Sequence, residues 1–436
     1  MPELNAGFGR RDITPPLGVP KALGLISFAE EIWDSLYTTV AVLKIDEDSV
    51  VVIGTDLCGF YQAAHREVRS AVSAALGIPS ERVVLNASHS HSAAIISTEL
   101  QEIVDPFGIK FTDLEYVKYV KQQILAAAQE AADRTGSARA WVGRGHVERV
   151  ASNRRPKFPD GKTVHRYGQP PPELRQLPEG LIDPEVLMVR FDSLDGNPLG
   201  ALSNYACHPT AAGGDCHPCV SGDFVGHGSR TIEAALGGAP CLFLQGCAGN
   251  IGTGKWVTGA RRQDTEDMGQ RFAEGALEGL KNAQPIAPTS LTTAWMEVPI
   301  AFDSFLPLDE LKRRMEEALK ANDAMAIAYG DALVVARRLA DFERASVVGI
   351  ALGDLAIVCL PGEVFVEFGL DIKRRSPFPH TLVCAYNDNS LQYIPTTAAF
   401  PEGEYEVNGG WRYIAAGAGE KLADGAVQVL ADLKSR

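Results

Sequence analysis

Residues 82–92 read Arg-Val-Val-Leu-Asn-Ala-Ser-His-Ser-His-Ser, a short apolar run that ends in two histidines. An apolar run of this length predicts a buried β-strand. His89 and His91 are two residues apart, so on an extended chain both side chains would project from one face. Such a pair can supply a metal ligand and a substrate contact. Two hydrogen-bonded structural histidines would give the same pattern, so the pair alone leaves both interpretations open.

Three other apolar runs also end beside polar or reactive groups. The run at 199–206 precedes His208, the run at 242–244 leads into the glycine-rich segment 245–254, and the run at 356–360 precedes Glu363. Reactive side chains directly after buried strands are typical of an α/β active site. A carboxylate after a buried strand also needs a partner, which a metal would supply. Two histidines and a carboxylate with an open position match a hydrolytic zinc site.

Strand and helix signals alternate along the whole chain, which predicts an α/β fold with mixed β-sheets flanked by helices. We expect one catalytic domain over residues 1–436, because no linker divides the sequence. Thr112 and Glu115 fit a capping box at the start of a helix over 113–134. The proline-rich and basic segment 151–181 predicts a long surface loop near the site. Other expected strands are 38–45, 50–54, 186–191, 346–351 and 381–386; other expected helices are 63–76, 226–235, 265–280, 308–339, 364–373 and 413–433.

Composition excludes several classes of protein. Among the 436 residues, 45% are hydrophobic and 22% are charged, a mixture that excludes a disordered chain. No apolar run reaches the ~20 residues of a membrane span, so we expect no membrane partner. A net charge of -14 disfavours nucleic acid. The N-terminus shows no secretory signal, so we expect a cytoplasmic protein whose eight cysteines form no disulfide framework. The expected partner is a small-molecule substrate, and a homo-oligomer is compatible with the sequence.

Several motifs together resemble the neutral/alkaline non-lysosomal ceramidase family, and they occur in the family's order over nearly the whole chain. They are Ala6-Gly7-Phe8-Gly9-Arg10-Arg11-Asp12-Ile13-Thr14-Pro15-Pro16, Ser88-His89-Ser90-His91-Ser92, His208-Pro209, Ser221-Gly222-Asp223, Pro361-Gly362-Glu363 and the segment from Tyr393 to Glu406.

The resemblance implies a site as well as a fold. It implies one Zn²⁺ per chain, and a role in substrate binding or transition-state stabilisation for His91, Arg154 and Tyr405. The spacing of twelve residues between Tyr393 and Tyr405 is also the family's spacing. The zinc ligands that the resemblance implies are His89, His208, Glu363 and Tyr393.

Two departures from the family change the expected chemistry. Where the ceramidases have a catalytic serine, this chain has Gly252, and Thr253 is displaced by one position. We therefore expect direct attack by water without a serine acyl-enzyme. We also expect a protein without the extra C-terminal domain and the secretion signal of the full-length ceramidases. A small soluble amide is thus the expected substrate, with an ester or lactone as second choice.

Three other features have competing interpretations. Cys216-His217-Pro218-Cys219 resembles half of a zinc site, but no second pair follows, so an active-site loop is favoured. The glycines of 245–254 lack the P-loop spacing, and Trp256 follows Lys255. They are better suited to backbone contacts with a substrate oxygen. Asp223 could orient a ligand histidine or cap a helix.

A non-catalytic alternative is a ligand-binding member of the same family that has lost the serine. A decayed site would be expected to lose metal ligands, and none is missing here. The sequence does not separate zinc from manganese or iron, because histidine and carboxylate ligands suit all three metals.

Overall fold

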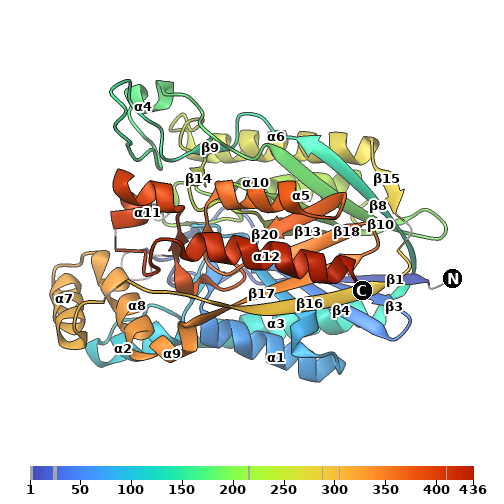
Figure 1. Cartoon of the computed structure of the whole chain (residues 1–436), viewed down its shortest axis with the longest axis horizontal. Helices are drawn as coiled ribbons and strands as arrows, with labels where there is room; N and C mark the ends of the chain where they lie inside the picture. Colours follow the sequence, from blue (N-terminus) through green and yellow to red (C-terminus); the bar gives the residue numbers. More distant parts are fainter. Residues whose placement is uncertain (1–2, 23–26, 215–216, 287, 304, 409) are drawn as a thin grey trace.

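The computed structural model consists of two β-sheets packed face to face, with helices on both outer faces (Figure 1). It describes residues 3–22, 27–214, 217–286, 288–303, 305–408 and 410–436. The predicted α/β class with mixed sheets and flanking helices is confirmed. Among the described residues, no helix has the length and apolar character needed to cross a membrane.

The larger sheet has nine strands, in the order β13-β11-β10-β8-β1-β3-β4-β6, with β15 paired to β8. Most neighbours are antiparallel, but β4 and β6 are parallel, as are β11 and β13. The strands are β1 (Leu4–Asp12), β3 (Tyr37–Ile45), β4 (Asp48–Thr55), β6 (Val83–Ala87), β8 (Gly136–His146), β10 (Glu185–Ser193), β11 (Pro198–Tyr205), β13 (Cys241–Gln245) and β15 (Gln284–Ile286).

The smaller sheet has four strands in the order β16-β17-β18-β20, namely β16 (Leu291–Pro299), β17 (Arg344–Leu352), β18 (Leu355–Cys359) and β20 (His380–Cys384). The core between the sheets follows the two-residue period of a strand. Leu4, Ala6 and Phe8 of β1 belong to the same buried cluster as Val348 and Ile350 of β17.

Helices cover the opposite faces of both sheets. The larger sheet is covered by α1 (Gln62–Leu76), α3 (Leu114–Asp133), α5 (Asp223–Ala235) and α6 (Arg261–Lys281), and the smaller sheet by α10 (Val366–Arg375) and α12 (Ala418–Lys434). Gly7 and Gly9 allow α3 to approach β1 closely, because a Cβ at either residue would clash with a backbone carbonyl of α3.

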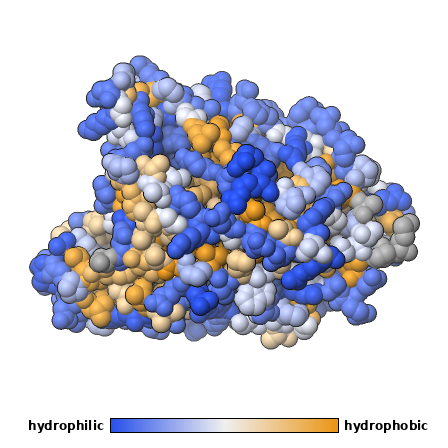
Figure 2. All heavy atoms as spheres, viewed as in Figure 1, coloured by the Kyte–Doolittle hydropathy of each residue, from blue (hydrophilic) through white to orange (hydrophobic). Residues whose placement is uncertain are grey.

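The remaining strands and helices lie in the connections around the two sheets. They are β2 (Glu31–Ile32), β5 (Gly59–Phe60), β7 (Ile95–Ile96), β9 (Ser152–Asn153), β12 (Cys219–Val220), β14 (Ile251–Gly252), β19 (Glu363–Val364), β21 (Tyr393–Ile394), α2 (Thr98–Val104), α4 (Pro172–Gln176), α7 (Leu308–Lys320), α8 (Met325–Arg337), α9 (Leu339–Phe342) and α11 (Tyr405–Asn408). Segment 151–181 is otherwise irregular, as the sequence predicts. Figure 2 shows apolar colour gathered over α7, α8 and α11, and Leu308 of α7 is 45% exposed.

Several predicted boundaries are wrong. The single helix expected over 308–339 is divided into α7, α8 and α9, with Asn322 in the left-handed region between the first two. The capping box is also wrong, because the side chain of Asp113 accepts the amides of Glu115 and Tyr116. The last helix begins at Ala418 rather than near 413, after Gly417 adopts a positive φ. The seven described cysteines are buried free thiols.

The α8 helix carries a buried acid that should make stability depend on pH. Oδ2 of Asp331 accepts a hydrogen bond from the Tyr61 hydroxyl at 2.5 Å and another from the amide of Gln392, whereas Oδ1 has no partner among the described residues. Burial, as the largest cause, raises the pKa of Asp331 from 3.8 to about 8. The protonated form is therefore the one that the folded state favours.

The wild type should lose stability as the pH becomes alkaline, and the Asp331→Asn variant should not. A raised folded-state pKa contributes stability that is complete below pH ~4 and is lost as the pH rises through ~8. Between pH 5 and pH 9 this amounts to about 4 kcal/mol for Asp331. Urea unfolding at both pH values should show the wild type losing this stability and the variant retaining it. Asp309→Asn, at an exposed site on α7, should behave as wild type; an identical pH dependence in all three proteins would contradict the assignment.

Candidate active site

His89, His208 and Glu363 converge where strands of both sheets end. Their ligand atoms all lie within 4.8 Å of one another, and the three residues are buried. Oε2 of Glu363 lies 3.0 Å from Nε2 of His208 and 3.6 Å from Nε2 of His89. His89 follows β6, His208 follows β11 and Glu363 begins β19, so residues far apart in sequence meet through the packing of two sheets.

Backbone contacts fix the orientation of both histidines. Nδ1 of His89 donates to the Cys58 carbonyl at 2.7 Å, and Nδ1 of His208 donates to the Ala248 carbonyl at 2.7 Å. Each Nε2 lone pair therefore faces Glu363. Burial lowers the pKa of both histidines well below 6.5, so both rings are neutral. Neutral imidazoles oriented through Nδ1, together with a carboxylate, form a donor set that fits a zinc ion.

A left-handed glycine directs Glu363 into this cluster. Gly362 has φ 75°, and its amide donates to the Asp388 carbonyl at 2.6 Å. A Cβ at this position would lie 2.8 Å from the Gln392 carbonyl oxygen, so a larger residue does not fit. The turn brings Glu363 beside Tyr393, its strand partner between β19 and β21.

Two tyrosines border the cluster. The buried ring of Tyr393 lies 5.8 Å from the ring of Tyr405 and 5.3 Å from the guanidinium carbon of Arg154. Burial raises its pKa well above 10, and Arg154 opposes this shift. Tyr386, which the sequence analysis did not identify, lies 4.3 Å from the ring of His89, and its hydroxyl is 3.4 Å from Nδ1 of His208. The sequence feature that could have identified Tyr386 is its position just after the buried strand β20.

His91 faces the cluster from the same strand end as His89. Its Nε2 lies 3.2 Å from Nε2 of His89, and its Nδ1 lies 3.3 Å from the hydroxyl of Tyr167. Tyr167 comes from the long segment 151–181. The two histidines therefore occupy different environments. His89 is buried beside Glu363, whereas His91 lies between His89 and segment 151–181.

Arg154 reaches the site from β9 and is 1% exposed. Its Nη2 donates to the Gly249 carbonyl at 2.5 Å, and its Nε lies 3.2 Å from Oε1 of Glu406. Nη1 is buried and has no hydrogen-bond partner among the described residues. Burial lowers the pKa of Arg154, but Tyr393 and Glu406 outweigh this and raise it overall. The guanidinium is thus a fixed cation with a donor still available.

Glu406 holds this arginine in place and was missed by the sequence analysis. It is fully buried, and its Oε2 accepts from Arg155 at 3.0 Å while its Oε1 faces Arg154. Despite burial, Arg154, His165 and Arg155 lower the pKa of Glu406, so it is ionised. A charged residue following Tyr405 in α11 gives no sequence signal that distinguishes it from a surface glutamate.

Three rings form a stack at the outer side of the site. His165 lies between Tyr167, with ring centroids 5.6 Å apart and planes at 9°, and Tyr405, at 4.9 Å and 16°. Burial lowers the pKa of His165 to about 4, so the ring is neutral. The stack thus presents aromatic faces together with polar atoms. Tyr405 is 36% exposed and forms its outer end.

Gly252, which occupies the position of the ceramidases' serine, is covered by the side chain of Arg154. Gly252 in β14 pairs with Ser152, and a Cβ on it would lie 3.1 Å from Cδ and 3.3 Å from Cγ of Arg154. The neighbouring hydroxyl of Thr253 is fully buried and lies 3.0 Å from the hydroxyl of Thr210. The aliphatic part of Arg154 therefore packs where a nucleophile would begin.

The remaining candidates have other contacts. Asp223 starts α5, and its carboxylate accepts the amides of Ala212 and Phe224 rather than a histidine. Cys219 lies 3.8 Å from the Ser92 hydroxyl. Cys216 lies outside the described residues, so the predicted Cys-His-Pro-Cys loop is described only in part.

Comparisons with known proteins identify a family and a fold. Residues 5–281 match the family model described as neutral/alkaline non-lysosomal ceramidase, N-terminal. Among solved structures, the chain is similar to the neutral ceramidase from Pseudomonas aeruginosa, with TM-score 0.77 and 18% identity, over 100% of this chain and 75% of that chain. A structure titled "Ceramidase complexed with C2" gives TM-score 0.75 and 19% identity, over 100% and 76%. These two likenesses concern the fold.

Proposed function

Because the chain belongs to the neutral/alkaline non-lysosomal ceramidase family, we propose that it is a zinc-dependent hydrolase that cleaves an amide bond by direct attack of water. Membership of the family indicates an enzyme that hydrolyses amide bonds. Our proposal adds three points to this: the zinc ion, the direct attack by water and a small polar substrate. The observation that carries the proposal is the convergence of two neutral histidines and Glu363 within 4.8 Å.

We assign the zinc to His89, His208, Glu363 and Tyr393. When bound, the metal would lower the pKa of a water molecule toward neutrality and polarise the scissile carbonyl. The protein's contribution is to keep both imidazoles neutral and oriented, through the Cys58 and Ala248 carbonyls. A ligand tyrosine must lose its proton, and the nearby Arg154 cation favours that loss.

The other residues act on the substrate. Arg154 offers Nη1, a buried cationic donor without a hydrogen-bond partner among the described residues, to the oxygen that becomes negative during attack. His91 is held between Tyr167 and His89 and can transfer a proton to the leaving nitrogen. Tyr405, whose ring lies 5.8 Å from the ring of Tyr393, is the third residue that we assign to the substrate. The polar edges of the ring stack favour a small polar acyl amide.

Removing the metal tests the proposal directly. Protein purified without added metal should contain about one zinc per chain, and a chelator should abolish hydrolysis of short-acyl amides until zinc is restored. An ester and lactone panel distinguishes the bond, and long-chain ceramide tests the polarity of the substrate. Full activity after complete zinc removal would overturn the metal assignment, and rapid turnover of long-chain ceramide would overturn the polar substrate.

Gly252→Ser should lower activity instead of creating a nucleophile. The added Cβ would lie 3.1 Å from Cδ of Arg154, so the arginine stem must shift by a few tenths of an ångström, and we expect a loss of rate below the ~10²-fold that a misplacement of ~1 Å can cost. Gly252→Ala, the matched control, adds the same Cβ without a hydroxyl and should lose as much activity. Rapid-quench kinetics should show no burst, and intact-mass spectra should show no adduct. A burst with an acyl adduct on the introduced serine, absent in Gly252→Ala, would contradict the prediction.

A further inference from the structure

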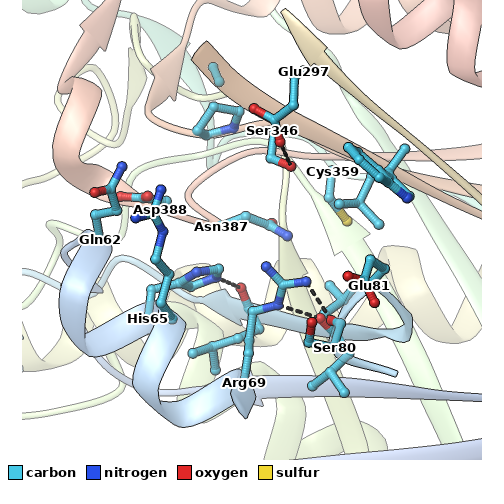
Figure 3. Close-up of a pocket in the computed structure, with 18 of the residues that line it drawn as sticks. Gln62, His65, Arg69, Ser80, Glu81, Glu297, Ser346, Cys359, Asn387 and Asp388 are labelled. Carbon is cyan, nitrogen blue, oxygen red and sulfur yellow. Dashed lines mark hydrogen bonds between the residues drawn. The ribbon is translucent and has the colours of Figure 1, made fainter. Parts of the chain in front are cut away.

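A cleft of about 280 Å³ lies between the edge of the larger sheet and the smaller sheet, apart from the histidine cluster. We call it the β6 cleft, because β6, α1 and the strands β17 and β18 all contribute to its walls (Figure 3). Its inner wall includes Pro361 and Asn387, which lie just outside the turn that directs Glu363. Its apolar lining includes Phe342, Val348 and the 54% exposed Trp295.

We propose that the β6 cleft binds a small, singly charged organic carboxylate, with Arg69 and Asn387 contacting the carboxylate group. This site is separate from the one assigned to hydrolysis, and the proposal does not depend on that assignment.

Arg69 is the central observation. Its Nε donates to the Val83 carbonyl at 2.7 Å and its Nη2 to the Ser80 carbonyl at 2.5 Å, which fixes the plane of the guanidinium. Figure 3 shows the group rising from α1 into the middle of the cleft. Arg69 forms no ion pair with a described residue, and burial lowers its pKa against the opposing effect of the more distant Glu81 and Asp388 carboxylates. A half-buried arginine without a carboxylate in direct contact is stabilised by a bound anion that makes this contact.

Asn387 provides a second donor on the opposite side. Its Oδ1 accepts from the Asn86 amide at 2.9 Å, so its own NH₂ group is the part directed toward the cleft. A planar carboxylate between this amide and the Arg69 fork would accept from both. Arg66 and Arg344 add positive charge at the exposed rim, and neither forms an ion pair with a described residue.

The acids of the cleft limit the charge of the ligand. Glu81, Glu297 and Asp388 also line it, and Glu297 accepts the Ser346 hydroxyl at 2.8 Å. His65 adds no charge, because burial lowers its pKa to about 3. A phosphate dianion would be repelled by three carboxylates, whereas one carboxylate is neutralised by Arg69. The apolar wall near Trp295 suits an aromatic or aliphatic body on the same molecule.

Calorimetric titration of the whole chain with sodium benzoate tests the proposal. We expect a dissociation constant of ~1 mM or below, and weaker binding of benzyl alcohol and of inorganic phosphate. Arg69→Met should abolish binding, and Arg66→Gln combined with Arg344→Gln should weaken it by about 3–10-fold through lost attraction. Arg313→Gln, on exposed α7, controls for a change in net charge and should bind as wild type.

Three results would overturn the proposal: no heat from benzoate, equal or tighter binding of benzyl alcohol or phosphate, or benzoate binding that survives the cleft substitutions. The last result would place benzoate elsewhere, including the histidine cluster. If Arg69→Met does not fold, the variant that combines Arg66→Gln with Arg344→Gln decides the test. Its two arginine side chains are exposed and make no hydrogen bond to described residues, so the variant should fold.

Discussion

His208→Ala should remove both the metal and the activity. The ring is fully buried, its Nε2 lies 3.0 Å from Glu363, and its Nδ1 is fixed by the Ala248 carbonyl, so the substitution removes one of the three converging ligand atoms. A metal supplies several kcal/mol of transition-state stabilisation, and ~4 kcal/mol corresponds to about 10³-fold in rate. We expect zinc content below about a tenth of wild type and a loss of at least about 10³-fold in kcat/KM.

His146→Ala is the matched control for this experiment. That histidine lies at the exposed end of β8, so its removal should leave zinc content and rate unchanged. Elemental analysis and amide hydrolysis should be measured on the same preparations, with circular dichroism to verify folding. A folded His208→Ala protein that keeps a full complement of zinc would show that the metal is held elsewhere, and would exclude the ligand set proposed above.

The histidine and glutamate positions could be predicted because strand ends leave a local signal. An apolar run followed by a polar residue identified His89, His208 and Glu363 without knowledge of the fold. Their meeting depends on two sheets packing face to face, which no local pattern encodes. Strands β1, β8 and β16 were not predicted. Gly7 and Gly9 in β1, and Gly143 and Gly145 in β8, interrupt the apolar pattern because helices α3 and α6 approach these strands closely.

Residues that act through others were not predictable in the same way. Tyr386 follows β20 as His89 follows β6, but a lone tyrosine after a strand is more often part of the core. Glu406 lies on the four-residue helix α11, and its partners Arg154 and Arg155 are about 250 residues earlier. Only the folded chain joins them. The resemblance to a family supplied roles for Arg154 and Tyr405, but not the carboxylate that holds the arginine.

Glu406→Ala should destabilise the fold and disable the site together. One fully buried carboxylate faces Arg154 at 3.2 Å and Arg155 at 3.0 Å, so its removal leaves Arg154 without a carboxylate in contact and Arg155 with only the partly exposed Glu402. Removing one partner of a buried ion pair costs about 3–5 kcal/mol of unfolding free energy. Glu402→Ala is the matched control: Glu402 is 29% exposed and also pairs with Arg155, so its loss should cost under about 1 kcal/mol.

Kinetics distinguish a positioning role for Glu406 from a purely structural one. If Arg154 acts mainly when negative charge develops on the substrate, its displacement should lower kcat per folded molecule with little change in KM. Glu406→Gln keeps an oxygen acceptor for Arg155, and should therefore retain more stability while still losing rate, because the charge that fixes Arg154 is gone. Unchanged kcat per folded molecule in both variants would limit Glu406 to holding the fold, and would imply that Arg154 is oriented sufficiently by the Gly249 carbonyl alone.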